Sequence, residues 1–429
     1  MGVWFGVAVG VGSMIGAGIL RAPAQVAAQL PSPGIFLLAW LIGGAYALLG
    51  ANAIAELACL APRSGGQYVF VRRALGGYSG FLVGWNDWLS TVGAAAAVAI
   101  VEAEALGALV PALAPYRIVV AEVAFAITTI VLLRGLRESD RAQRMTSLVK
   151  ALVLLALVGA CVAWRLYAGP AAAPAQPVAA PHGLTLLAAM AIALQGIVFA
   201  YDGWTGVIYF AGEVRDPARQ IPRALIGGLL ATIALYVLLN LAFILVLPLD
   251  AMAASPLAAS SAAAVVFGAN GGFVVQLLIA LALPSALVAN SLCASRVAFA
   301  LGQDGLAPAS FGRVNPGGTP SAALVASSIV GALLLLSGTF ERIIAICAFL
   351  FVASYAMSFL SVFVLRRREP DVPRPYRAWG HPWTTAIVLL GSLVFLASML
   401  AADPRGAAIV VALLVASYPT YRLITRRGA

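Results

Sequence analysis

Three closely spaced glycines interrupt the first apolar run of the chain. They are Gly12, Gly16 and Gly18, within the stretch VGSMIGAGIL at residues 11–20. Glycine destabilises a helix interior by about 1 kcal/mol relative to alanine, so this spacing predicts that a helix breaks here. Backbone N–H groups freed at the start of the following segment would bind an anion such as a carboxylate. Carbonyl groups freed at the end of the preceding segment suit a cation or an ammonium group.

A second interruption lies in FAYDGWTGVIYFAG, at residues 199–212. Asp202 and Gly203 form a turn signal inside an apolar run, and a charged residue at such a position is a candidate functional residue. The alternative for both stretches is that small residues let continuous helices pack closely. The interruptions fall at matching places in the first and sixth apolar runs, which favours two broken helices that meet at one binding site.

Lys150 is the only lysine of the chain, and it lies a few residues into the apolar run MTSLVKALVLLALV. Arginines stand just before it, yet this position alone is lysine. Lysine can lose its proton when it is desolvated, whereas arginine cannot. The alternative is a side chain whose charged end reaches the membrane surface. Lys150 is therefore a candidate for a functional charge inside the protein.

The elements that must position these residues are membrane helices. Of the 429 residues, 62% are hydrophobic and 10% are charged, which is too little charge to cover a soluble domain of this length. Apolar runs near the roughly 20 residues that cross a bilayer recur from end to end. The sequence predicts an all-α polytopic protein in a lipid bilayer, with a single transmembrane domain over residues 1–429. About twelve spans are expected, at residues 3–27, 34–60, 79–109, 118–133, 146–167, 184–212, 221–248, 272–301, 321–337, 343–365, 384–401 and 407–424.

The net charge of +10 does not call for a nucleic-acid partner. The arginines concentrate in alternate loops, which is the pattern of positive charge on the cytoplasmic side of a membrane. With an even number of spans, this pattern places both termini in the cytoplasm and the chain in the cytoplasmic (inner) membrane. Because Met1 stands almost at the start of the first span, either that helix begins at the membrane edge or a further segment precedes it.

The sequence shows no catalytic or metal-binding set. The four cysteines lie in or beside apolar runs without ligand spacing, and the two histidines lie in separate predicted loops. Neither a Ser/His/Asp cluster nor a phosphate-binding GxxxxGK[ST] loop is present. We therefore expect no enzyme, no metal, no cofactor and no ATP-driven transport. In the third span, Asn86 and Asp87 lie toward the inner end, whereas Glu102 and Glu104 lie toward the outer end, where we expect a solvated or vestibule position.

Five motifs carry a family resemblance. GSMIGAGI fits the first-helix pattern G-[ST]-x-I-G-[SA]-G-I, and FAYDGW fits a sixth-helix signature followed by the loop GEVRDPARQIPRA. The segments PRSGGQYVFVRRALG, ASRVAFALGQDGLAPASFGRVNPGGTP and RRREPDVPRPYRAWGHPW follow the second, eighth and tenth helices in register. Over essentially its whole length the chain resembles the amino acid–polyamine–organocation (APC) transporter superfamily, and within it the L-type amino acid transporter-like branch.

The resemblance implies a LeuT-like fold. This fold has two inverted five-helix repeats, at about residues 3–167 and 184–365, and two further helices at about 384–424. Its first and sixth helices are unwound at mid-membrane. The implied function is secondary active transport of L-amino acids by alternating access.

The resemblance also implies a substrate site between the two unwound segments. The carboxylate would rest on the first-helix backbone and the ammonium group on carbonyls of the sixth helix, with Phe199 as an aromatic gate. Some relatives carry serine in place of Ala17, so carboxylate binding here would rest on the backbone alone. Asp202 could accept the ammonium group or cap the outer half of the sixth helix. The implied set is Met14, Ile15, Gly16, Ala17, Gly18, Phe199, Ala200, Tyr201, Asp202 and Thr205.

For Lys150, the resemblance implies a place between the first, fifth and eighth helices, where sodium-coupled relatives hold a cation. The lysine ammonium would substitute for that cation, with Ser291 and Ser295 as candidate partners. Ordinary hydrogen bonding between helices is the alternative for both serines. Two modes stay open, namely proton-driven uptake through a titrating Lys150 and obligatory exchange with Lys150 as a fixed charge.

The substrate and the functional class also have alternatives. The apolar pocket favours neutral amino acids, whereas Asp202 leaves a cationic amino acid or polyamine antiporter as the runner-up. A channel would need a selectivity ring or filter, and the sequence shows none. A sensor that keeps the fold without transport is a further alternative. We expect a monomer or a weak homo-oligomer.

Overall fold

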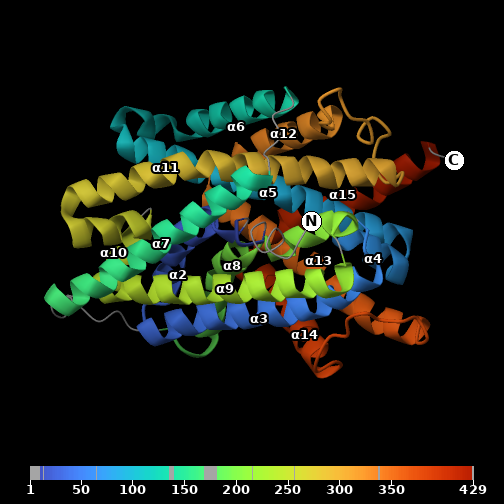
Figure 1. The fold of residues 1–429 in the computed structure, drawn as a ribbon, viewed down its shortest axis with the longest axis horizontal. Coiled ribbons are helices and arrows are strands. Elements are labelled where there is room, and N and C mark those ends of the chain that lie inside the picture. The colour runs from blue at the N-terminus through green and yellow to red at the C-terminus, as the bar shows by residue number, and fades with distance from the viewer. Residues whose placement is uncertain are drawn as a thin grey trace.

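The chain folds into one helical bundle. The structure is a computed structural model that describes residues 10–12, 14–63, 65–134, 140–168, 181–214, 216–255, 257–336 and 339–427, in which every regular element is a helix. Most helices run along the long axis of the molecule, and α4 lies at the same end as the C-terminus (Figure 1). The elements are α2 (Ala17–Gln29), α3 (Pro33–Leu60), α4 (Gln67–Leu75), α5 (Gly77–Leu109), η1 (Pro111–Tyr116), α6 (Arg117–Leu133), α7 (Asp140–Ala168), α8 (Gly183–Tyr201), η2 (Trp204–Glu213), α9 (Pro217–Val246), α10 (Leu249–Ala254), α11 (Ala258–Gln303), α12 (Ser321–Leu335), α13 (Phe340–Arg368), α14 (Trp383–Ala402) and α15 (Pro404–Arg427).

Within the described residues, ten helices are long and apolar enough to cross a membrane. Large apolar side chains on their outer faces are exposed, as expected where the neighbour is lipid. The predicted class, an all-α polytopic membrane protein, is confirmed. The count of twelve spans stays a prediction. The ninth expected span is the 15-residue helix α12, and the first lies partly outside the described residues.

Helices α5 and α13 form the centre of the bundle, because they are the most buried of the membrane-length helices. Helix α5 packs against both α11 and α13. Small residues allow this close approach, since a Cβ added to Gly93 would lie 2.4 Å from the Cys347 sulfur on α13. The central position explains why Glu102 is only 7% exposed, so the expected solvent contact of this residue is wrong.

The region before the eighth expected span is helical, although we had expected a connection there. Helix α11 begins at Ala258 rather than near residue 272, and it is interrupted at Gly268, where φ is +75°. The alanine-rich start of α11 has high helix propensity, and only glycine adopts the left-handed conformation of the break at little cost. The preceding short helix α10 packs on α2, so this region covers the first helix.

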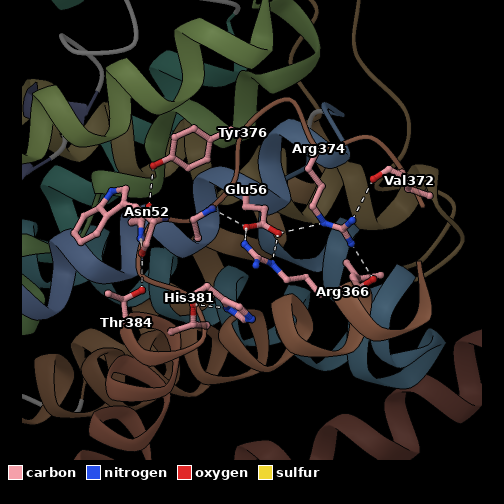
Figure 2. Close-up of polar contacts among 12 residues, drawn as sticks. Asn52, Glu56, Arg366, Val372, Arg374, Tyr376, His381 and Thr384 are labelled. Atoms are coloured by element: carbon pink, nitrogen blue, oxygen red, sulfur yellow. Dashed lines mark hydrogen bonds and ion pairs between the residues drawn. The ribbon is translucent and has the colours of Figure 1, made fainter. Parts of the chain in front are cut away.

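The loop between α13 and α14 is fastened to α3 by buried polar groups (Figure 2). Glu56 is 2% exposed. Its carboxylate accepts two hydrogen bonds from Arg366, at 2.9 and 2.6 Å, and one from the Ala378 amide at 2.7 Å. Arg374 Nε lies 3.2 Å from the same carboxylate. Asn52, one turn earlier on α3, accepts from Tyr376 at 2.8 Å. The end of α13 and the start of α14 are thereby held to α3.

Candidate functional site

The chain leaves the helical conformation at the glycines of the first interruption. Residues 10–12 and 14 are helical, Ile15 and Gly16 form a turn, and α2 begins at Ala17. Gly16 has extended backbone angles, with φ −144° and ψ −150°. Among the residues that the structure describes, no side chain caps the first turn of α2, which leaves its backbone amides for a ligand.

The second interruption has a comparable geometry. Helix α8 ends at Tyr201, Asp202 is extended, and Gly203 adopts the left-handed conformation with φ +102°. The Asp202 amide turns back to the carbonyls of Val198 and Phe199, at 2.9 and 3.3 Å. The 3-10 helix η2 then begins at Trp204. The backbone therefore departs from helical angles at both interruptions, while the unwinding of two membrane helices at mid-membrane stays a prediction.

Contacts from a third helix join the two interruptions. The hydroxyl of Tyr236 on α9 lies 2.6 Å from the Met14 carbonyl and 3.1 Å from the Ala200 carbonyl. Because a hydroxyl has one proton, Tyr236 donates to one carbonyl at a time. Gly18 lies directly against α8, since a Cβ added to it would be 2.5 Å from Ala200 Cα. The residues predicted to bind opposite ends of a ligand thus lie side by side.

Phe199 belongs to a layer that covers one side of the two interruptions. Its ring packs edge-on against Phe340 of α13, at 5.9 Å between centroids. The guanidinium of Arg21 on α2 lies 5.9 Å above the Phe340 ring. Arg21 also pairs with Glu341 at 3.1 Å and with Glu104 at 3.8 Å. Glu104 therefore joins α5 to this layer, and its side chain is 15% exposed.

Three polar residues of the second interruption have different surroundings. Asp202 Oδ1 accepts a short hydrogen bond from the hydroxyl of Tyr355 on α13. The Tyr201 hydroxyl donates to the Trp40 carbonyl at 3.3 Å, so this side chain packs against α3 and only its backbone is left for a ligand. Thr205 is 4% exposed, at the start of η2.

Lys150 lies beside the first interruption, whereas the two serines do not share its cavity. A cavity of about 90 Å³ is lined by Lys150 of α7, by Ile15 and Gly16 of the turn, and by apolar side chains of α11. The described lining includes neither Ser291 nor Ser295. Ser295 donates to the Leu292 carbonyl within its own helix, and the buried Ser291 hydroxyl has no partner among the described residues.

On the other side of the interruptions, a polar cavity opens near the arginine-rich end of the bundle. It has a volume of about 320 Å³, and its lining includes Arg63, Tyr68, Tyr209 and Asp304. Asp304 at the end of α11 binds Arg72 of α4 at 3.1 Å. The paired interruptions therefore lie between an aromatic layer and a charged cavity.

The comparison with known proteins accounts for this arrangement. A family model for amino acid permeases matches residues 1–420. The chain belongs to the amino acid permease family. This permease is 27% identical to the serine/threonine exchanger SteT of Bacillus subtilis (strain 168), over 100% of its own length and 97% of the exchanger. It is 28% identical to the large neutral amino acids transporter small subunit 2 of Homo sapiens, over 96% and 78% of the two chains. The b(0,+)-type amino acid transporter 1 of Mus musculus is 26% identical to it, over 94% and 83%.

These matches confirm the APC resemblance, and with it the assignment of this permease as a multi-pass membrane protein that transports amino acids. Sequence reasoning missed Tyr236, Tyr355 and Arg21 as residues around the site. One feature of the sequence could have indicated Arg21, because it is among the few arginines outside the arginine-rich loops. No feature of the sequence indicated Tyr236 or Tyr355, since a tyrosine in an apolar run does not show where its hydroxyl lies.

Proposed function

We propose that this permease carries neutral L-amino acids across the cytoplasmic membrane by alternating access, with the substrate held between the two helix interruptions. The observation that carries this proposal is the shared contact of Tyr236 with Met14 and Ala200. It supports the proposal that the two interruptions form one site rather than two. The concentration of arginines at one end supports a cytoplasmic location for that end and for both termini.

The backbone supplies complementary groups for a zwitterion. The amides at the start of α2, with the positive end of its helix dipole, suit the carboxylate. The carbonyls at the end of α8, which carry the negative end of that helix dipole, suit the ammonium group. Because Ala17 has no hydroxyl, the carboxylate depends on backbone amides alone.

The hydrogen bond that Asp202 already accepts favours neutral substrates over cationic ones. Tyr355 already donates to this carboxylate, and the neighbouring Tyr201 and Phe199 side chains are engaged in aromatic packing. A second ammonium group would have to displace the Tyr355 hydrogen bond. The relatives named for large neutral amino acids and for serine and threonine support the same choice. Transport of cationic amino acids stays the runner-up, because Asp202 is acidic.

Alternating access needs a closure on each side of the site. The layer of Phe199, Phe340 and Arg21 supplies one, and the charged groups of the arginine-rich end supply the other. We propose that α2 and α8 rock between them, as in transporters built from broken helices. Lys150 stands next to the turn at Gly16 and supplies a fixed positive charge beside it.

Transport in liposomes tests this function. Purified permease is reconstituted, and uptake of labelled amino acids is measured with unlabelled amino acid inside, with a panel of competitors outside. We expect counterflow that neutral L-amino acids inhibit best. The Gly16→Leu variant should lose binding, because its side chain would fill the space for the carboxylate. The absence of amino acid flux under every gradient would favour a sensor or a channel and would refute the proposal.

A further inference from the structure

Asp87 is a buried carboxylate that the amino acid site does not use. It lies on α5, is 3% exposed, and its Oδ1 accepts a 2.6 Å hydrogen bond from the Tyr209 hydroxyl of η2. Its Oδ2 has no hydrogen-bond partner within the described chain. The ion pairs of that part of the chain do not include Asp87. A carboxylate withdrawn from water without a counter-charge is costly, so such a group calls for a proton or a cation.

The unpartnered oxygen is buried close to the charged cavity. Tyr209, the partner of Oδ1, lines that cavity together with Gly65. At the adjacent Gly66, a Cβ would lie 2.7 Å from the Tyr209 ring and 3.2 Å from Asp87 Oδ2. Since glycine has no side chain, Gly66 places only backbone atoms beside Oδ2. The carboxylate is therefore one residue layer away from the cavity at the arginine-rich end.

The other neighbour of Asp87 is the amino acid site itself. Asp202 in the second interruption is close enough to interact electrostatically with Asp87. Two carboxylates of like charge repel each other, so the protonation of one affects the other. Within the described residues, the titratable and charged groups around Asp87, Asp202, Tyr209 and the cavity are Tyr355 and Cys347 of α13, Cys293 and Arg296 of α11, Tyr46 of α3, Tyr68 of α4, and Arg63 and Asp304.

We propose that Asp87 is a proton-binding site of the transport cycle, which releases its proton to the charged cavity past Tyr209 and is coupled to the substrate through Asp202. The step is the transfer of one proton from the protonated carboxyl at Oδ2 to water, which leaves a carboxylate and a hydronium ion, and no other bond changes. A proton fits better than a metal cation, because hard cations such as Ca²⁺ and Mg²⁺ take about six to eight oxygen ligands, whereas a single oxygen is unpartnered here. The inference rests on the proposed amino acid site and assigns the proton to Asp87 rather than to Lys150.

Two transport assays on the same liposomes test this assignment. The first is counterflow, which needs no net proton movement. The second is uptake into empty liposomes driven by an acidic exterior, with a trapped pH dye that reports proton entry. For Asp87→Asn we expect counterflow to persist while gradient-driven uptake falls about tenfold and proton entry is lost, a coupling within the usual 5- to 150-fold range. Asp250→Asn, at an exposed carboxylate of α10, is the matched control and should keep both activities.

A spectroscopic readout protects the test against a variant that folds poorly. The infrared difference spectrum between acid and alkaline pH should contain the carbonyl band of a protonated buried carboxyl, and Asp87→Asn should lack it. Tyr209→Phe, which removes the hydrogen bond to Oδ1, should shift that band. Proton-driven uptake that survives in Asp87→Asn, or uptake driven only by sodium, would overturn the assignment. If the unmodified permease shows no counterflow at all, the proposed function fails first, and this inference fails with it.

Discussion

At the scale of single residues, the proposed site depends on backbone groups and on the absence of side chains. Gly16 permits the turn before α2, Gly203 adopts a positive φ after α8, and Gly18 lets the two segments touch. In the sequence, the glycines predicted the first interruption and the Asp-Gly pair predicted the second. The residue that joins them, Tyr236, was not predictable, because nothing in the apolar pattern of α9 indicates which side chain reaches across to two carbonyls.

The contact at Gly18 gives the sharpest residue-scale prediction. In Gly18→Ala the new methyl group would lie 2.5 Å from a backbone atom of α8, so α2 and α8 must move apart. We expect substrate affinity to fall about tenfold, or about 1.4 kcal/mol of binding free energy. The matched control is Gly159→Ala on α7, where nothing lies within 4 Å of the added carbon. Equal affinities in both variants, measured by substrate titration, would contradict the close contact.

At the scale of elements, the positions of the helices along the chain were more predictable than the neighbours against which each helix packs. The expected span at residues 34–60 and α3 (Pro33–Leu60) coincide almost residue for residue, because a long apolar run bounded by proline and polar residues leaves few alternatives. The helical start of α11 and the burial of Glu102 were missed. Both depend on which helices become neighbours, and hydropathy along the chain does not carry that information.

The attachment of the α13–α14 loop to α3 is testable by stability. Glu56→Gln leaves two arginines near a buried neutral amide, and breaking a buried ion pair costs about 3 to 5 kcal/mol. We expect a clear loss of thermal stability in detergent. Glu369→Gln removes a partner of Arg73 that is 25% exposed, and it should cost about 0 to 1 kcal/mol. A similar small loss in both variants would show that the Glu56 cluster (Figure 2) does not hold these elements together.

The same loop carries a pH-dependent group. Burial lowers the pKa of His381 below its ordinary value of 6.5, and Arg366 lowers it further, whereas Glu56 raises it. Because the folded pKa lies below the unfolded one, the unfolded chain binds more protons between these two values, and stability increases with pH there. The contribution of His381 is complete above pH 6.5 and is lost as the pH falls through the lowered value. Thermal unfolding of His381→Gln should depend less on pH in this range, and a curve parallel to that of the unmodified permease would disprove the role.

At the scale of the whole molecule, the proposed mechanism combines two broken helices, a fixed charge beside one of them and closures at both ends. Lys150 links α7 and α11 to the turn at Gly16 through a shared cavity. Lys150→Ala should reduce transport sharply, while thermal unfolding changes little because the side chain is partly exposed. Lys150→Arg, which keeps the charge but cannot lose its proton, should retain exchange. Normal uptake with normal pH dependence in Lys150→Ala would refute the assigned role.

The central claim is that two stretches of bare backbone hold both ends of one zwitterion. Competition binding with modified amino acids tests it most directly. The panel contains the best neutral L-amino acid, its amide, which lacks the carboxylate, and its N-acetyl derivative, which lacks the ammonium group. We predict that only the unmodified amino acid competes for the labelled substrate, and that each modification weakens binding by at least about a hundredfold, near 2.7 kcal/mol. An amide or an N-acetyl derivative that competes as well as the parent amino acid would contradict the account.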